Sequence, residues 1–389
     1  MRVLSLIAGL ICLAEVLVDA FQTIILPRRA SGRLRISRVF LTATWIPWRA
    51  IAGRMRQTRK RESFLSYFGP LSLLLLVGVW ACGLIAGFAL LFHALGSPFV
   101  DAHSLSVSET DFYVSGTTLF TLGLGDVIPL SVGSRLLIAL EAGTGLAFVA
   151  GVIGYLPVLY GAFSRREVSI ILLEARAGSP PTALELLRRH AGPAGEAALE
   201  TLLVEWERWS AELLESHISY PQLCFFRSQH DNQSWLSALV AMLDTCAVLI
   251  ATVEGDAARQ AQHTFVIARH AVIDLAHIFA PQKAGHPIRI EDRLPPGRVD
   301  EICHQLASAG YTLCSATASL ERLRELRAMY EPQAFLLGRL LMQQLPPFSP
   351  APGKPTNWMV VSGLRSQTEA SLSAGRSNRP AFSEEEHRF

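Results

Sequence analysis

The chain has 389 residues, of which 50% are hydrophobic and 17% charged, and its mean hydropathy is +0.31. An ordinary soluble protein of this size is less apolar, so the composition indicates insertion into a membrane. The formal net charge of +2 gives no reason to expect a nucleic-acid partner, and we expect membrane lipid instead.

The first apolar segment, Val3–Leu26, is interrupted by Glu15 and Asp19, which lie one helical turn apart on the same face. A carboxylate that faces lipid is costly, so we expect both side chains to face protein. The alternative is a cleaved signal peptide with Arg2 as its basic start. The charge distribution favours a retained spanning helix with its N-terminus outside the cell.

A stretch rich in arginine follows this segment. Residues Arg35–Arg56 combine Trp45 and Trp48 with spaced arginines, which suits an interfacial amphipathic helix bent at Pro47 and held by anionic headgroups. The alternative is a basic loop that only fixes the topology. In both cases the stretch belongs in the cytoplasm, because basic loops next to spanning segments stay there.

Two further segments are long enough, at 1.5 Å per residue, to cross a hydrocarbon core of roughly 30 Å. The outer helix is Leu71–Phe92, which carries no charge, and the inner helix is Leu136–Phe163, whose only charged residue is Glu141. Arg165 and Arg166 place the end of the inner helix in the cytoplasm. The residues between the two helices therefore face outside.

Ser106 and Glu109 fit a capping box, which predicts a short helix from about Glu109 to Phe120. That helix leads into the run Thr117–Pro129, TTLFTLGLGDVIP. Unpaired backbone at membrane depth is tolerated only where protein buries it or where it lines a watery path. The run therefore indicates a pore.

The pattern Thr118-x-x-Thr121-x-Gly123-x-Gly125-Asp126 resembles the signature of potassium-channel pore loops, usually written TxxTVGYGD. The resemblance extends to Pro129, Gly133 and Arg135, and it covers roughly residues 66–163. It implies a two-helix pore with K⁺ as the transported ion. We expect no cofactor and no enzymatic activity.

By this resemblance the selectivity filter consists of Thr121, Leu122, Gly123, Leu124, Gly125 and Asp126. Glycine permits the backbone angles that aim successive carbonyls at one axis, where they replace the hydration shell of K⁺. Thr121 would add its hydroxyl, both leucines would pack away from the axis, and Asp126 would lie at the outer mouth. Leu124 stands where most channels have tyrosine or phenylalanine, which leaves the selectivity for K⁺ over Na⁺ open.

On the inner helix, Gly145 lies where the resemblance places a gating hinge, although close helix packing also uses glycine. Pro157 would kink the helix near its cytoplasmic end and act as a gate. The resemblance assigns the lining of an apolar cavity to three residues between them, Leu146, Val149 and Ile153.

Glu141 precedes this hinge by one turn and is expected behind the filter. A carboxylate at membrane depth is a functional candidate. Two roles are open for Glu141: a hydrogen bond to the pore helix that stiffens the loop, or titration coupled to gating.

Each chain offers one pore loop, and a closed ring needs several, so four copies are implied. We expect a homotetramer, in which Gly83-x-x-x-Gly87 on the outer helix helps to pack the subunits.

The second half of the chain reads as a cytoplasmic helical bundle whose ligand is unknown. Five helices are predicted there: Thr182–Arg189, Gly195–His217, Ser234–Val253, Ala257–Phe279 and Arg298–Leu345. His263, His270 and His277 recur every seven residues on one face. His270 and Asp274, four positions apart, are weak candidates for a transition-metal or proton-sensing site.

The sequence thus predicts an all-α membrane protein in five parts: 1–27, an N-terminal transmembrane helix; 28–66, a basic cytoplasmic or interfacial linker; 67–163, an ion-channel pore domain; 164–346, a cytoplasmic helical domain; and 347–389, a disordered tail. Its predicted function is passive K⁺ conduction across the plasma or inner membrane. The alternative is a membrane-anchored metal- or proton-responsive sensor or enzyme with a vestigial pore.

Overall fold

The computed structural model describes residues 1–26, 35–101, 106–230, 233–253, 255–279, 292–294, 296–311 and 316–350. Residues 351–389 of the expected tail and the first arginines of the basic stretch, Arg28, Arg29 and Arg33, lie outside these ranges. The described part is almost entirely helical, as predicted. Its elements are α1 (Arg2–Ile24), α2 (Ile36–Arg54), α3 (Thr58–Ser66), α4 (Phe68–Leu95), β1 (Phe99–Asp101), α5 (Val107–Leu119), β2 (Val127–Pro129), α6 (Val132–Ala177), α7 (Ala183–Arg189), α8 (Pro193–Ser219), the 3₁₀ helix η1 (Pro221–Phe225), α9 (Trp235–Thr252), α10 (Asp256–Phe279), α11 (Pro296–Ser308), α12 (Ala316–Ala328) and α13 (Glu331–Leu341).

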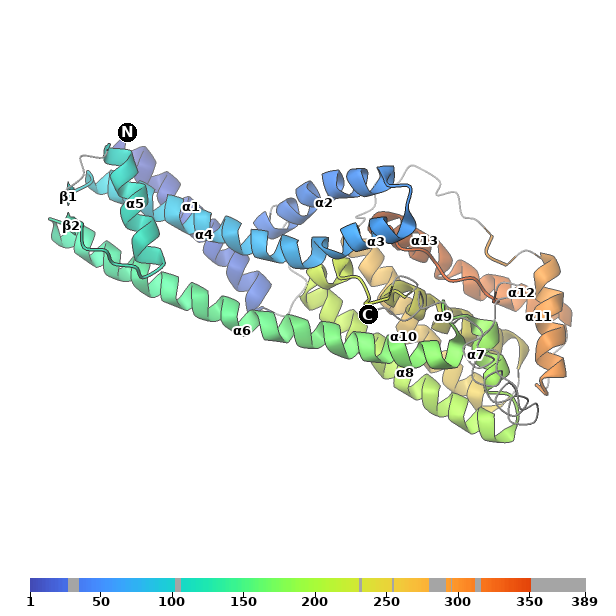
Figure 1. The fold of residues 1–389 in the computed structure, drawn as a ribbon. Helices are drawn as coiled ribbons and strands as arrows, with labels where there is room; N and C mark the ends of the chain where they lie inside the picture. The colour runs from blue at the N-terminus through green and yellow to red at the C-terminus, as the bar shows by residue number, and fades with distance from the viewer. Residues whose placement is uncertain are drawn as a thin grey trace, which may run out of the picture.

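The molecule is elongated (Figure 1). One end is built from α1, α4, α5 and the first part of α6, and the other end from α7 to α13. The N-terminus lies beside α5 and the β1–β2 ribbon, at the end farthest from the helical bundle. Helix α6 runs along most of the length and belongs to both ends.

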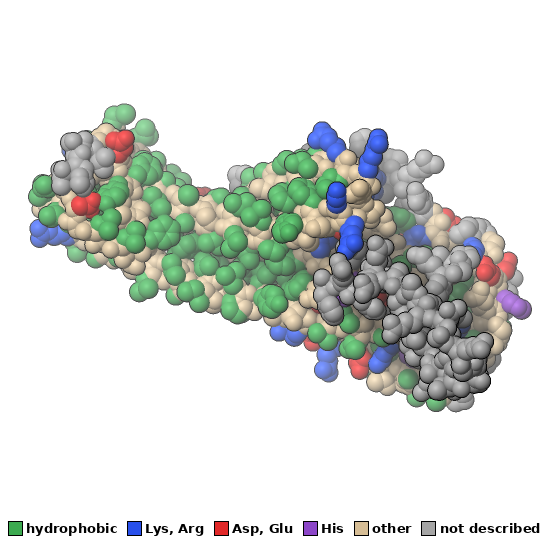
Figure 2. Space-filling view, viewed as in Figure 1, with side chains coloured by type: hydrophobic (Ala, Val, Ile, Leu, Met, Phe, Trp, Pro, Cys, Tyr) green, Lys and Arg blue, Asp and Glu red, His purple; other side chains and the backbone are tan. Residues whose placement is uncertain are grey.

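Within the described residues, four helices are long and apolar enough to cross a membrane: Arg2–Ile24, Thr58–Leu95, Val132–Ala177 and Trp235–Thr252. The first three correspond to the predicted spans. Figure 2 shows hydrophobic side chains over the end formed by α1, α4 and α6, and lysine and arginine over α2 and α3, where this apolar surface stops. In the fourth, α9, 94% of the residues are buried inside the protein, and α9 is the central helix of the bundle.

Helix α1 packs along α4, and this contact confirms that Asp19, one of its two acidic residues, faces protein. Asp19 is 4% exposed and accepts a hydrogen bond of 2.8 Å from the indole of Trp80 on α4. It also accepts from Ser37 and forms an ion pair of 3.3 Å with Arg35, both at the start of α2. The expectation for Glu15 is wrong for the single chain, where its side chain is exposed, because residues 14 and 15 lie on the face of α1 turned away from α4.

The small residues of the outer helix serve this intrachain contact, not the subunit packing expected for them. A Cβ atom added to Gly83 would lie 2.7 Å from Val16, and one added to Gly87 would lie 2.6 Å from Leu13. Both neighbours belong to α1. The glycines therefore let α1 and α4 approach closely.

The stretch expected at the interface is helical, which excludes the basic-loop alternative. Pro47 lies inside α2. Trp45 and Trp48 do not face lipid headgroups: the Trp45 indole donates to the carbonyl of Leu340 in the bundle at 2.9 Å, and the Trp48 ring stacks on Phe64 of α3 at 4.4 Å. Helix α2 thus connects the spanning helices to the bundle through its aromatic face.

The bundle has the predicted helices as far as Phe279, but the predicted single helix Arg298–Leu345 is three helices, α11, α12 and α13. Gly310 adopts a positive φ of 100° just after α11, and Pro332 occupies the first turn of α13. Proline is tolerated at a helix start and not in its interior, so a continuous helix cannot form there.

Candidate functional site

The short helix of the predicted pore loop begins where its capping box places it. The hydroxyl of Ser106 accepts from the backbone of Glu109, and the carboxylate of Glu109 accepts from the backbone N–H of Ser106 at 2.9 Å. Helix α5 then descends between α4 and α6. After the loop, β2 returns and pairs antiparallel with β1, so the chain dips into the apolar end of the molecule and comes back.

The residues predicted as the filter follow α5 without regular structure. Positive φ recurs at every second residue, with 57° at Thr121, 53° at Gly123 and 77° at Gly125. Glycine adopts such angles without penalty, whereas a threonine is strained there, and such strain is typical of functional segments. Backbone N–H groups of Thr121 and Leu122 donate to carbonyls of α5 at 2.9 Å and 2.8 Å, which fixes where the run begins.

All residues of this run from Thr121 to Gly125 are exposed in the single chain, and the side chains of Leu122 and Leu124 are 63% and 64% exposed. Two large apolar side chains beside strained backbone would be unfavourable in water. The surface around the run is therefore open for lipid or further protein to cover.

Asp126, at the end of the run, accepts a hydrogen bond of 2.7 Å from the hydroxyl of Tyr113 on α5. This bond spans the loop and ties the end of the run to the middle of its supporting helix. Sequence reasoning missed Tyr113, because an isolated tyrosine inside a short helix gives no signal of its partner.

Glu141 is fully buried and receives a hydrogen bond of 2.5 Å from Ser115 on α5. The same hydroxyl lies 2.9 Å from the carbonyl of Ile85 on α4. The side chain of Ser115 therefore joins all three helices of the pore loop at one point. Of the two roles open for Glu141, this geometry matches the hydrogen bond to the pore helix.

A second buried carboxylate, Asp111, was missed. It is 1% exposed, accepts from Ser97 at 2.7 Å and lies 3.4 Å from His93, which places it between α5 and the end of α4. The rule that singled out Glu141, an ionisable group at membrane depth, could have found Asp111 as well.

Gly145 touches the end of α5. A Cβ atom at this position would lie 2.1 Å from the carbonyl oxygen of Leu119, two residues before Thr121. Close packing, the alternative to a hinge, therefore accounts for this glycine. Helix α6 also continues without interruption through Pro157 and far beyond Phe163, so the expected domain boundary falls inside the helix.

The residues expected to line the cavity lie on an open face of α6. Leu146 and Ile153 are 65% and 66% exposed in the single chain, and Val149 is 38% exposed. Pro157 is exposed as well. These side chains face away from α4 and α5, so they are available to line a path between copies of the chain.

The part of α6 beyond the apolar end of the molecule is tied to the bundle by Arg166, which is 4% exposed. Its guanidinium donates to the carbonyls of Leu223 and Phe226 at 3.0 Å and 2.9 Å and lies 3.1 Å from the ring of His217. Burial, and secondly the charge of Arg166, lower the pKa of His217 well below its ordinary value. The ring is therefore neutral at pH 7.

The loop that Arg166 holds also touches the outer helix. Phe225 packs edge-on against Phe68 at 5.2 Å, and a Cβ atom on Gly69 would lie 2.8 Å from the ring of Phe226. One segment of the bundle, Tyr220–Phe226, thus contacts both spanning helices of the pore loop. No motif announces this segment, because the contacts join residues more than fifty positions apart.

The weak candidates for metal ligands are not brought together into a site. His263, His270 and His277 are exposed on α10. Among the residues that the structure describes, no group of three or more histidines, cysteines or acidic residues is arranged to hold a metal ion.

Comparison with known proteins agrees with this geometry. Residues 76–159 match a family described as "Ion channel". The chain is also 27% identical over 248 residues to the "Uncharacterized membrane protein YdjJ" of Bacillus subtilis (strain 168), an alignment that covers 61% of this chain and 67% of the relative. No solved structure matches the chain significantly.

The matched segment runs from the middle of α4 through α5 and the filter-like run to the middle of α6. This match supports a channel. The protein is an all-α membrane protein, and its residues 76–159 match an ion-channel family.

Proposed function

We propose that four copies of this chain surround a central axis and conduct K⁺ passively through the backbone of Thr121–Asp126. The observation that carries the proposal is the strained run between α5 and α6, with positive φ at alternate residues and an uncovered surface in the single chain. A dehydrated K⁺ needs a cage of oxygens, and carbonyl rings provide one.

The supporting contacts give this run the rigidity that a filter needs. Its start is bonded to carbonyls of α5, its end is held by Tyr113, and the helix behind it is fixed by Ser115 and Glu141. Leu124 offers no hydroxyl behind the filter, so the bond between Tyr113 and Asp126 takes on the restraint that an aromatic hydroxyl would supply there.

The charge pattern supports an orientation with the bundle in the cytoplasm. The basic residues over α2 and α3, together with Arg165, lie where the apolar surface stops on the bundle side (Figure 2). The N-terminus lies at the opposite end with the pore loop (Figure 1), which supports an external N-terminus.

Reconstitution in planar bilayers tests the proposal. We expect K⁺-dependent currents whose reversal potential follows the K⁺ gradient against Na⁺, and we expect Gly123→Ala to abolish them, because alanine resists the positive φ that this position requires. Gly116→Ala is the matched control. Gly116 lies inside α5, where no described atom is within 4 Å of an added Cβ. Current that persists in Gly123→Ala, or an absence of current from the tetramer, contradicts the proposal.

A further inference from the structure

A cavity of about 170 Å³ lies where α3 meets the bundle. One bound water needs only about 10–15 Å³ by the same measure, so the cavity has room for a small organic molecule. Its walls come from α3, the first turn of α9 and the chain after α13. The lining residues that matter for its chemistry are Arg61, Glu62, Arg227, Gln233, Ser234 and Gln343.

Three polar atoms of the lining side chains are buried and have no hydrogen-bond partner within the described part of the chain: Nε of Arg61 and Oε1 of Gln233 and Gln343. The two glutamines are only 7% and 6% exposed. Burying a polar atom without a partner is costly, so nearly all such atoms in folded proteins are satisfied by protein, water or ligand. The side chains that line the cavity therefore hold one donor and two acceptors without a partner.

The cavity carries a positive charge. Arg61 and Arg227 share the carboxylate of Glu62, at 3.7 Å and 3.3 Å, so two cations face one anion. Helix α9 adds to this field, since it begins here with Ser234 as its N-cap and the positive end of a helix dipole attracts anions. The charge favours an anionic ligand, and the two free glutamine oxygens require that ligand to donate hydrogen bonds.

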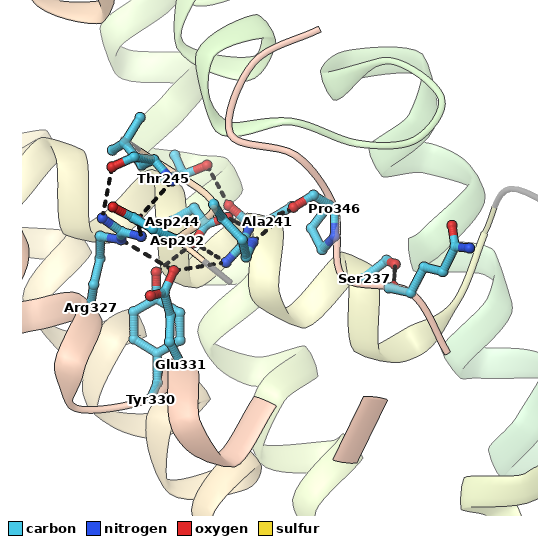
Figure 3. Close-up of polar contacts among 12 residues, drawn as sticks. Ser237, Ala241, Asp244, Thr245, Asp292, Arg327, Tyr330, Glu331 and Pro346 are labelled. Atoms are coloured by element: carbon cyan, nitrogen blue, oxygen red, sulfur yellow. Dashed lines mark hydrogen bonds and ion pairs between the residues drawn. The ribbon is translucent and has the colours of Figure 1, made fainter. Parts of the chain in front are cut away.

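The wall of the cavity after α13 is fixed independently of any ligand. Arg227 donates to the carbonyls of Leu341 and Met342, and Ser237 donates to that of Gln344 at 2.8 Å. Figure 3 shows the neighbouring polar network, in which Asp244 is fully buried and accepts from Tyr330. Arg293 pairs with Asp244 and donates to the carbonyl of Pro346 at 2.7 Å.

Because the wall of this half-open space is already fixed, binding a ligand there costs the protein little conformational entropy. We propose that it is a binding site for a small phosphate ester with free hydroxyl groups, either a soluble metabolite or the headgroup of an anionic lipid. The phosphate pairs with Arg61 and the first turn of α9, and the hydroxyls donate to Gln233 and Gln343.

The cavity is connected to both long helices of the ion-channel domain, α4 and α6, without being lined by either. Helix α3 leads into α4 through the single residue Tyr67, and Gln233 donates through its other amide atom to Glu174 of α6. If the chain conducts ions as proposed above, occupancy of the cavity changes the open probability. That regulatory part rests on the proposed function, whereas the binding itself does not.

Calorimetry of the full chain in detergent, with glycerol 3-phosphate as the probe, tests the binding. We expect saturable binding that weakens at least tenfold in Arg61→Gln and in Gln343→Leu. Arg59→Gln is the matched control: it removes the same charge from an exposed position of α3 that does not line the cavity, so it keeps the wild-type affinity. Inorganic phosphate should bind more weakly, since it lacks the carbon-borne hydroxyls that reach the glutamines.

A second arm distinguishes the two sources of the phosphate ester. The melting temperature is measured in nanodiscs of phosphatidylglycerol and of phosphatidylcholine. If glycerol 3-phosphate does not bind but phosphatidylglycerol raises the melting temperature in the wild type and Arg59→Gln, and not in Arg61→Gln, the ligand is the lipid headgroup. Absence of both effects in folded protein overturns the proposal, as does equal binding by Arg61→Gln and the wild type. Because neither arm uses ion current, a protein that binds but does not conduct refutes the channel and not the site.

Discussion

Replacing Gly145 with alanine separates two explanations of this glycine. An added Cβ would lie 2.1 Å from the carbonyl oxygen of Leu119, whereas real Cβ atoms essentially never come within 3.0 Å of such neighbours. Helix α6 or the end of α5 must therefore shift by about 0.9 Å, the difference between these distances. Overpacking of this kind costs about 1–3 kcal/mol.

The shift falls two residues before Thr121, so the filter receives it directly. If about 1.4 kcal/mol of the cost appears as weaker ion coordination, the conduction rate changes about tenfold. In single-channel recordings we expect Gly145→Ala to lower the unitary K⁺ conductance about tenfold or to shift the reversal potential toward that of a less selective pore. Gly143→Ala, where no described atom lies within 4 Å of the new Cβ, should behave like the wild type.

A hinge predicts a different outcome. Alanine would stiffen the helix and lower the open probability, while the unitary conductance and the reversal potential of each opening stay unchanged. That result would refute the packing argument and restore the hinge.

Further predictions concern the supports of the pore and of the bundle. Asp19→Ala leaves the buried indole N–H of Trp80 without its acceptor, so the purified protein should lose about 1–3 kcal/mol of stability, seen as a lower melting temperature; an unchanged melting temperature contradicts this. Tyr113→Phe removes the hydrogen bond from Tyr113 to Asp126 and should lower the permeability ratio of K⁺ over Na⁺ in reversal-potential measurements, and an unaltered ratio would show that the bond is dispensable. The pKa of His217 is lowered in the folded state, so folding opposes its protonation. The free energy of unfolding should therefore fall as the pH drops below about 6.5, by up to about 1.4 kcal/mol per pH unit. The melting temperature of His217→Gln should depend less on pH over the same range.

The local elements of the pore domain could be read from the sequence because each has a short-range cause. The capping box of Ser106 and Glu109 places the start of α5 correctly, and Gly96, a glycine with φ 88°, ends α4. The order of two spans and a filter-like run needs no long-range contact to be recognised.

Contacts between distant residues could not be read in this way. The spacing of Gly83 and Gly87 indicates close approach of another helix, but it does not say whether that helix belongs to the same chain or to a neighbour. Helix α6 likewise extends past Phe163. The predicted end marks where the apolar pattern stops, but the backbone hydrogen bonds of the helix continue beyond it. The cavity beside Arg61 combines residues from four parts of the chain, so no local motif marks it.

Because α6 is unbroken, it can rotate as one rigid rod about the point where Gly145 contacts the end of α5. Ala177 lies 32 residues beyond it, a lever arm of about 48 Å, and Pro157 lies 12 residues beyond it, an arm of about 18 Å. A sideways movement of roughly 4 Å at the bundle corresponds to a rotation of only about 5°, and it moves the helix at Pro157 by about 1.5 Å. Force applied by the bundle therefore acts at Pro157 multiplied about 2.7-fold, the ratio of the two arms. A small molecule that shifts the bundle by the width of one methyl group would thus act on the helix at Pro157 with a mechanical advantage.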